Sequence, residues 1–297
     1  MSDAAIAEIE LLPPVAPDRV TGDRLRALLR NPSGLIGLVL FAIPVILTLL
    51  AVAGLLPAEP AKQDPPSRLQ GPSLDHLFGT DQFGRDLFSR VAAGVANSAI
   101  IALVAVGIAA VVGTLAGLVS GFFRGVTDSV VGGVANILFA FPPLLLALSL
   151  ASVLDRTRFT VALAIAVVYI PIFTRVVRGP VLSLREVEFV RAATSTGQRR
   201  ALVMLRHVLP NVAPIVIIQV TLSLSWAVLT EAALSYLGLG APPPAPSLGL
   251  MVFEARSLMY RAPWMMIAPG AVVVVVVVAL NLLGDGLRDV FDPRSRR

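Results

Sequence analysis

Few residues in this chain could carry out covalent chemistry. The 297-residue sequence has no cysteine and only two histidines, His76 and His207, which lie outside its long apolar stretches. A thiol nucleophile, a disulfide and a thiolate metal site are therefore excluded. A nucleotide-binding P-loop ends in Gly-Lys followed by Ser or Thr, but the single lysine, Lys62, is followed by Gln63. We expect a non-catalytic chain that binds no cofactor itself.

One acidic residue, Glu231, lies inside an apolar stretch. Counted from Asn211 along a helix, it lies about 30 Å away, near the far end of a membrane span. An ionisable residue at such a depth is by default a functional candidate. It could face a pathway and meet a substrate amine, or it could bond a neighbouring helix and shape an outer gate. The helix ending predicted at 235–240 (SYLGLG) favours the second role.

The stretch HLFGTDQFGRDLFSR (76–90) combines turn-forming glycines with short polar side chains. Its candidate residues are Gly79, Thr80, Asp81, Gly84, Arg85 and Asp86. Such residues bond backbone amides in turns and at the starts of helices. A self-satisfied turn before a capped helix is the favoured interpretation, and a docking surface for a substrate-delivering partner is the alternative. Two carboxylates without a third ligand are weak support for a metal site.

The elements that position these residues are predicted to be membrane spans. Hydrophobic residues make up 56% of the chain and charged residues 14%, whereas soluble domains average about 25% charged residues. Six apolar runs are close to or above the ~20 residues that a spanning helix needs. These runs are approximately 34–56, 92–121, 129–153, 159–179, 211–238 and 264–284. We therefore predict an all-α polytopic membrane protein with six transmembrane helices, and not a soluble helical core.

The distribution of basic residues predicts the orientation of these spans. Six spans place both termini on one side of the membrane, and 16 of the 24 Lys and Arg residues fall on that side. The positive-inside rule makes it the cytoplasm. We divide the chain into a cytoplasmic tail (1–33), a first span with an outer segment (34–75) and a core with five spans (76–297).

A basic loop over 184–210 interrupts the apolar pattern on the cytoplasmic side. We predict two short helices separated by Gly197, with Pro210 in the first turn of the next span. The expected apolar faces comprise Leu184, Val187, Val190 and Ala193 in the first helix, and Ala201, Leu202, Leu205, Val208 and Leu209 in the second. A membrane-surface anchor and a docking surface have the same pattern. The pattern alone leaves both open.

This loop resembles the EAA loop of permease subunits in bacterial ATP-binding-cassette (ABC) importers. The family pattern runs from Glu-Ala-Ala through a glycine to a Leu-Pro ending, and here Arg191 stands where the family has Glu. The resemblance implies that the loop contacts an ATPase subunit. The residues it implicates are Glu188, Arg191, Ala192, Ala193, Gly197, Leu209 and Pro210.

Further stretches resemble the C-type permeases of dipeptide, oligopeptide and nickel importers. They are the 76–90 motif, NILFAFPPLLLAL (136–148), TEAALSYLGLG (230–240) and NLLGDGLRDVFDPR (281–294). The resemblance covers nearly all of the chain after residue 30. It implies the type I importer fold, with this chain forming half of a translocation pathway for peptides in a bacterial inner membrane.

The same resemblance implies a set of partners. These are a second homologous permease, two cytoplasmic ATPase subunits that bind ATP and Mg, an extracytoplasmic binding protein and membrane lipid, with no nucleic acid. Nickel, glutathione or another small solute is the alternative cargo. A self-sufficient secondary transporter is less favoured, because the sequence shows neither a charged midplane site nor inverted repeats. A non-transporting scaffold would have no need of a glycine-hinged coupling loop.

Overall fold

The computed structural model describes residues 26–242 and 244–291, so most of the predicted tail 1–33 and the last six residues lie outside the described chain. Its regular elements are helices. The long ones are α2 (Pro32–Val52), α3 (Leu87–Phe123), α4 (Gly125–Phe139), α5 (Pro143–Val153), α6 (Arg158–Leu184), α9 (Leu209–Tyr236) and α11 (Trp264–Phe291). The short ones are η2 (Pro65–Ser67), α7 (Glu188–Ser195), α8 (Arg200–Val203), the π-helix η3 (Met204–Val208), α10 (Leu248–Ala255) and η4 (Arg256–Leu258).

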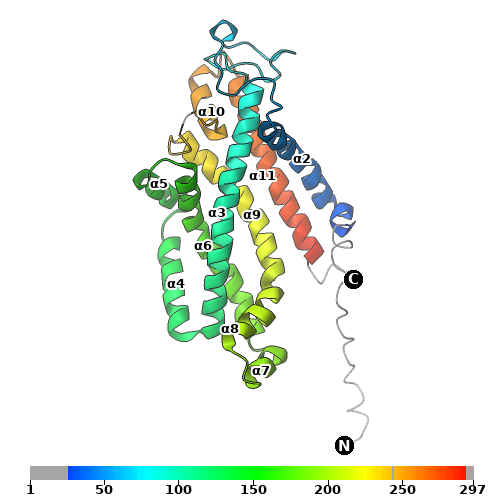
Figure 1. Cartoon of the computed structure of the whole chain (residues 1–297), viewed down its shortest axis with the longest axis vertical. Helices are drawn as coiled ribbons and strands as arrows, with labels where there is room; N and C mark the ends of the chain where they lie inside the picture. The colour runs from blue at the N-terminus through cyan, green and yellow to red at the C-terminus, as the bar shows by residue number, and fades with distance from the viewer. Residues whose placement is uncertain (1–25, 243, 292–297) are drawn as a thin grey trace, which may run out of the picture.

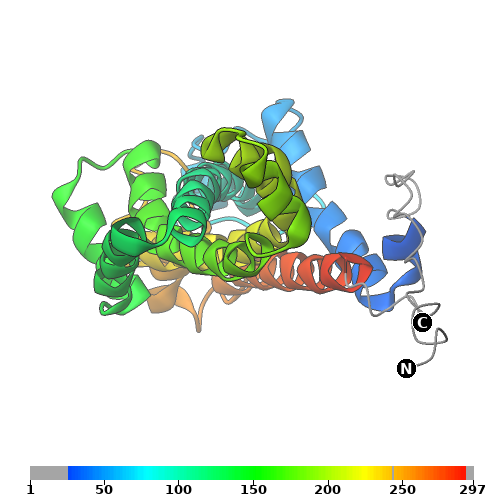
Figure 2. The same cartoon turned by 90° about the horizontal axis from the view of Figure 1, so that it is seen from below.

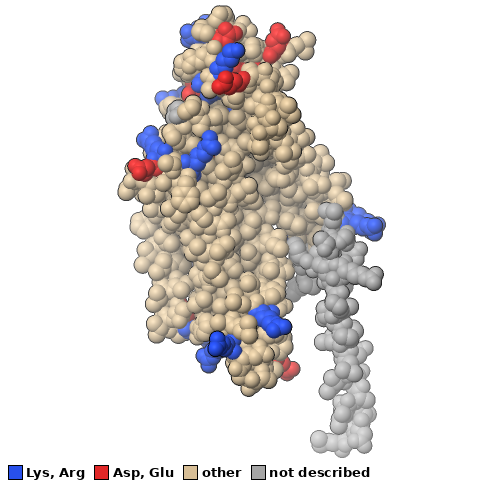
Figure 3. All heavy atoms as spheres, viewed as in Figure 1, with Lys and Arg blue, Asp and Glu red and all other residues tan. Residues whose placement is uncertain are grey.

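The spans follow the apolar runs of the sequence. Five helices of the described residues are long and apolar enough to cross a membrane, and α4 with α5 makes a sixth if the bent pair counts as one span. On the face seen in Figure 3, charged side chains gather toward the ends of the molecule and a broad band between them is almost free of charge. The predicted all-α polytopic fold is confirmed.

The third predicted span is not one straight helix. The structure breaks the run 129–153 into α4 and α5, which meet at an angle of 91°. Pro142 and Pro143 explain the break, because a proline lacks the N–H for the helix ladder and disfavours helical geometry in the residue before it. The span predicted over 129–153 is therefore present as a bent pair of helices.

A seam of glycines holds α3 against α6, the most extensive helix contact of the fold. Gly113, Gly117 and Gly121 are spaced four residues apart and share one face of α3. A Cβ at Gly117 would lie 2.6 Å from the carbonyl oxygen of Thr174, and one at Gly113 would lie 2.6 Å from that of Ile170. Small residues at such positions let membrane helices approach closely. The two helices therefore form a rigid centre for the bundle.

The first and last spans pair along one edge of the molecule, opposite α4 (Figures 1 and 2). Asn31 caps α2 through its Oδ1, and its Nδ2 donates a 2.7 Å hydrogen bond to Oδ2 of Asp289 near the end of α11. The beginning of α2 and the end of α11 therefore lie on the same side, as an even number of spans requires. In Figure 1, α7 and α8 lie at one end of the molecule, and α10 lies near the other.

Candidate functional site

The basic loop forms two short helices around a glycine turn, as the sequence predicts. Helix α7 ends at Ser195, and Gly197 follows with φ of +80°. This left-handed conformation suits glycine because it has no Cβ. No atom lies within 4 Å of the place where a Cβ at Gly197 would stand. The constraint on this residue is therefore conformational and does not come from crowding.

One face of the loop is buried against the ends of two spans. Val190 of α7 and Val203 of α8 are 1% and 0% exposed. The cluster that they join consists of Leu118 and Phe122 of α3, Val177 and Val181 of α6, Met204 and Val208 of η3, and Val212 of α9. The loop is thus packed onto the bundle and is more than a segment lying on the membrane surface.

The predicted buried face of the second short helix was partly wrong. Ala201, Leu202 and Leu205 are exposed, and Val203 and Met204 are buried in their place. Val208 is buried as predicted, and Leu209 is partly buried. The π-helix η3 explains the difference, because its i→i+5 pattern brings residues five apart onto one face. The π-helix η3 also lies just before Pro210. In a regular α-helix the ring of this proline would clash with the carbonyl of the residue four positions earlier.

The outward face of the loop is apolar with a basic surround. Phe189, Leu202 and Leu205 are 44%, 48% and 47% exposed. The structure separates the two alanines of the motif: Ala192 is exposed, whereas Ala193 packs against the buried cluster. Of the other candidate residues, Glu188, Arg191, Gly197 and Pro210 are exposed and Leu209 is partly buried.

Two arginine contacts near this end of the molecule, one an ion pair and one a hydrogen bond to a backbone carbonyl, were missed by the sequence reasoning. Arg178 of α6 donates two hydrogen bonds to the carboxylate of Asp128 in the first turn of α4, at 2.5 and 2.7 Å. Arg185, just after α6, donates from Nη1 to the carbonyl oxygen of Phe122 at 2.8 Å. These residues join the loop and the third span to the central helix pair. An acidic residue in a first helical turn was the available signal for the first contact.

The outer motif 76–90 is an internally bonded turn. Thr80 is fully buried; its hydroxyl donates to the carbonyl oxygen of Ser67 at 2.5 Å and accepts from the backbone N–H of Gln70 at 2.9 Å. Asp81 Oδ1 accepts from the backbone N–H groups of Phe83 and Arg85, at 2.8 and 3.0 Å. Thr80 and Asp81 therefore have the backbone partners that a self-satisfied turn needs, whereas Nη2 of Arg85 and Nε of Arg90 are buried without a hydrogen-bond partner.

The same turn begins the second span. Asp86 is the N-cap of α3: Oδ1 accepts from the N–H of Ser89 at 2.7 Å, and Oδ2 lies 3.0 Å from Nδ1 of His76. Gly79 and Gly84 have φ of +75° and +74°. A Cβ at Gly84 would overlap the backbone carbonyl of Asp64. Both positions need glycine because their backbone is left-handed, and Asp86 determines where the helix starts.

A buried ion cluster connects this turn to α10. Arg85 Nε donates to Asp81 Oδ2 at 2.6 Å, and Arg90 Nε lies 3.4 Å from the same oxygen. Both guanidinium groups also approach Glu254 Oε2, at 3.6 and 3.7 Å. Arg90 is only 4% exposed, so its charge depends on these carboxylates. The sequence reasoning did not single out Arg90 or Glu254, because residues 164 positions apart share no local pattern.

Glu231 of α9 is fully buried and bonded to three serines. Oε2 accepts from Ser98 of α3 at 2.5 Å, and Oε1 accepts from Ser235 at 2.7 Å and from Ser247 at 3.4 Å. Ser247 is the residue before α10. The carboxylate therefore ties three segments together, which is the contact pattern expected of the structural role.

Comparison with known proteins assigns this arrangement to a family. Residues 113–297, more than half of the chain, match the family described as the inner membrane component of binding-protein-dependent transport systems. The chain belongs to this family. The resemblance to ABC importer permeases drawn from the loop and the outer motif is confirmed, and the chain is a transport component.

Relatives of this permease match along most of their length. It is 38% identical over 274 residues to the dipeptide transport system permease protein DppC of Alkalihalophilus pseudofirmus, covering 92% of this chain and 90% of the relative. It is 39% identical to a putative peptide transport system permease protein of Brucella abortus, over 91% of each. It is 40% identical to the glutathione transport system permease protein GsiD of Escherichia coli, over 76% of this chain and 75% of the relative.

Proposed function

We propose that this permease imports peptides and that residues 184–210 couple it to ATPase subunits. The cargo is supported by 38% identity along 90% of a dipeptide transport permease. The observation that carries the coupling role is a loop whose one face is buried against α3 and α6 while the other is apolar and exposed. Exposed apolar patches on such a surface are typical of protein contacts.

The buried face supplies the route by which motion would reach the spans. Val190 lies in one cluster with Leu118 of α3 and Val177 of α6. Closely packed apolar groups resist separation, because every gap opened between them forfeits contact. A push on α7 therefore displaces the ends of both spans together. The glycine seam between α3 and α6 makes the pair move as one body.

The exposed face is shaped for a groove in a partner. Ala192 has a small side chain, so the exposed surface does not protrude at this position. Phe189 precedes the turn at Gly197 and Leu202 follows it, and both are larger apolar side chains that are exposed. Arg191, in the position where the family has Glu, is exposed and has room to turn toward solvent or lipid headgroups. An apolar centre with a charged surround is the usual composition of a specific interface.

The proposed assembly places the permease in a bacterial inner membrane, with both termini and the coupling loop in the cytoplasm. Two ATPase subunits bind ATP and Mg, and this chain binds neither. A homologous permease completes the pathway, and an extracytoplasmic binding protein delivers the cargo.

Transport by the purified complex in liposomes tests the cargo and the energy source. We expect uptake of a labelled dipeptide that requires binding protein outside, ATP inside and this chain. Uptake driven by an ion gradient without the ATPase subunits would overturn the importer assignment. Glutathione is the second candidate cargo, because of the 40% identity to a glutathione permease. Saturable uptake of glutathione with none of dipeptides would assign the permease to that cargo.

A further inference from the structure

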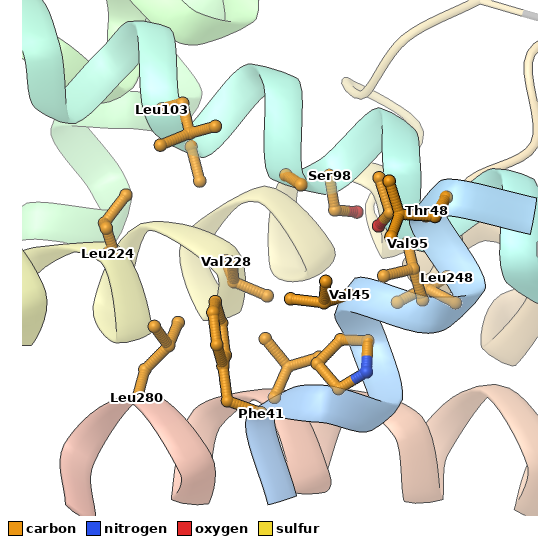
Figure 4. Close-up of a pocket in the computed structure, with 15 residues that line it drawn as sticks. Phe41, Val45, Thr48, Val95, Ser98, Leu103, Leu224, Val228, Leu248 and Leu280 are labelled. Atoms are coloured by element: carbon orange, nitrogen blue, oxygen red, sulfur yellow. The ribbon is translucent and has the colours of Figure 1, made fainter. Parts of the chain in front are cut away.

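An apolar cavity of about 240 Å³ lies between four spans, α2, α3, α9 and α11. Figure 4 shows side chains from these helices converging on it, with Phe41 and Val45 of α2 across from Val228 of α9. Much of its floor is buried: Val95, Val228 and Leu280 are 3%, 5% and 6% exposed. The cavity is therefore a built feature of the bundle interior.

The cavity offers almost nothing to a polar ligand. Thr48 and Ser98 are the only polar residues among those that line it. The hydroxyl of Ser98 is already committed, since it donates to Glu231 at 2.5 Å. An apolar cavity of about 150 Å³ stays dry and takes benzene in preference to water. A larger cavity of the same kind suits a hydrocarbon occupant, and by the same ratio it has room for roughly ten carbon atoms.

The mouth of the cavity opens toward the lipid-facing surface. Leu49 of α2 and Leu103 of α3 line it and are 61% and 60% exposed. All four helices around it are candidate membrane spans. The hydrocarbon that surrounds exposed apolar residues of a span is the acyl region of the bilayer. The surface around the mouth is thus continuous with the surface that lipid chains cover.

We propose that this cavity is a binding site for one acyl chain of a membrane phospholipid, inserted between α2 and the central bundle. The bound chain supports the contact network of Glu231, because one lining residue belongs to that network and another adjoins it in the chain. Ser98 is a hydrogen-bond donor to the carboxylate, and Leu248 directly follows Ser247, a second donor. The lipid is then a structural part of the permease and helps to position α2, which packs on the bundle along one edge.

A phospholipid with a photoactivatable diazirine in its acyl chain tests this site in membranes containing the unmodified full-length permease. Annular lipid does not reach Val228 and Leu280, which are nearly buried, whereas a chain in the cavity does. We expect crosslinks at these two residues in addition to the lipid-facing surface. Crosslinks confined to exposed residues such as Val39 and Val111 would overturn the proposal.

A bulky substitution that fills the cavity can be compared with the same substitution outside it. Ala102 lines the cavity and is 1% exposed, whereas Val111 lies on the same helix, outside it, and is 62% exposed. Ala102→Phe should lose the crosslinks at Val228, and Val111→Phe should keep them. Ala99→Leu, a smaller change at another lining position, serves if Ala102→Phe does not fold.

Melting temperature after lipid removal provides a second readout. Wild type and Val111→Phe should melt at lower temperature when delipidated, and the filled variant should lose this dependence. Retention of the buried crosslinks in a folded, filled variant would contradict the site. Equal melting shifts in all variants would contradict the supporting role of the lipid.

Discussion

Replacing Glu231 by alanine should destabilise the permease far more than replacing it by glutamine. The carboxylate accepts three hydrogen bonds, and those from Ser98 and Ser247 link α9 to other segments. Hydrogen bonds between membrane helices contribute about 0.6 kcal/mol on average and up to about 1.7 kcal/mol. Alanine also leaves buried hydroxyls without an acceptor, at about 1–3 kcal/mol. We expect Glu231→Ala to lower the free energy of unfolding by about 2–4 kcal/mol.

Glu231→Gln keeps the volume and one acceptor oxygen. The amide adds a donor, and a serine hydroxyl can rotate to accept from it. The loss should therefore stay below about 1 kcal/mol, and the complex should assemble with modestly reduced uptake. The double variant Glu231→Ala with Ser98→Ala should lose less than the sum of the single changes, because the two residues are bonded directly.

Chemical unfolding in lipid bicelles measures these free energies, and uptake in liposomes is measured on the same preparations. Two results would refute the structural role. One is a Gln variant that is as unstable as the Ala variant. The other is a Gln variant that is stable and assembled but transports nothing, which would place the carboxylate in the pathway.

Three further changes test other parts of the structure. Gly117→Leu should force α3 off α6 and cost at least about 1–3 kcal/mol, whereas Gly107→Leu, with no atom within 4 Å, should melt like wild type. Gly197→Val should cost about 1–2 kcal/mol through its left-handed backbone and should weaken ATPase co-purification without impairing membrane insertion; unchanged co-purification would count against the hinge. An impermeant thiol reagent on intact cells should label a cysteine at Ser73 and not at Ser195, and labelling at Ser195 would contradict the topology.

Much of the fold was predictable because apolar length alone identifies spanning helices. The hinge at Gly197 and the cap at Asp86 were also predictable, since both depend on local chain geometry. Pro142 and Pro143 signalled the break between α4 and α5. A count of apolar residues does not detect it, because the hydrophobic run continues across the two prolines and predicts one span. The bend angle depends on what the two half-helices pack against, and the sequence of one segment does not contain it.

The contacts between distant segments were beyond sequence reasoning. Arg90 and Glu254 meet across 164 positions, and Ser98 reaches Glu231 across 133. The π-turn at 204–208 moved the buried face of the loop by changing helical register. A regular period of 3.6 residues had placed Leu202 inside, whereas it lies exposed. These features follow from tertiary packing and from a local departure from regular helix.

The rate at which a maleimide labels a cysteine at position 192 tests the central claim that the loop 184–210 binds an ATPase subunit. Ala192→Cys introduces a thiol on the exposed face of this cysteine-free chain, and Val126→Cys introduces one at the start of α4, where Val126 is 81% exposed. We predict that bound ATPase subunits strongly slow maleimide labelling of Ala192→Cys and leave the Val126→Cys rate unchanged. Labelling of Ala192→Cys at the same rate with and without ATPase subunits, in a complex that still couples ATP hydrolysis to uptake, would contradict the account.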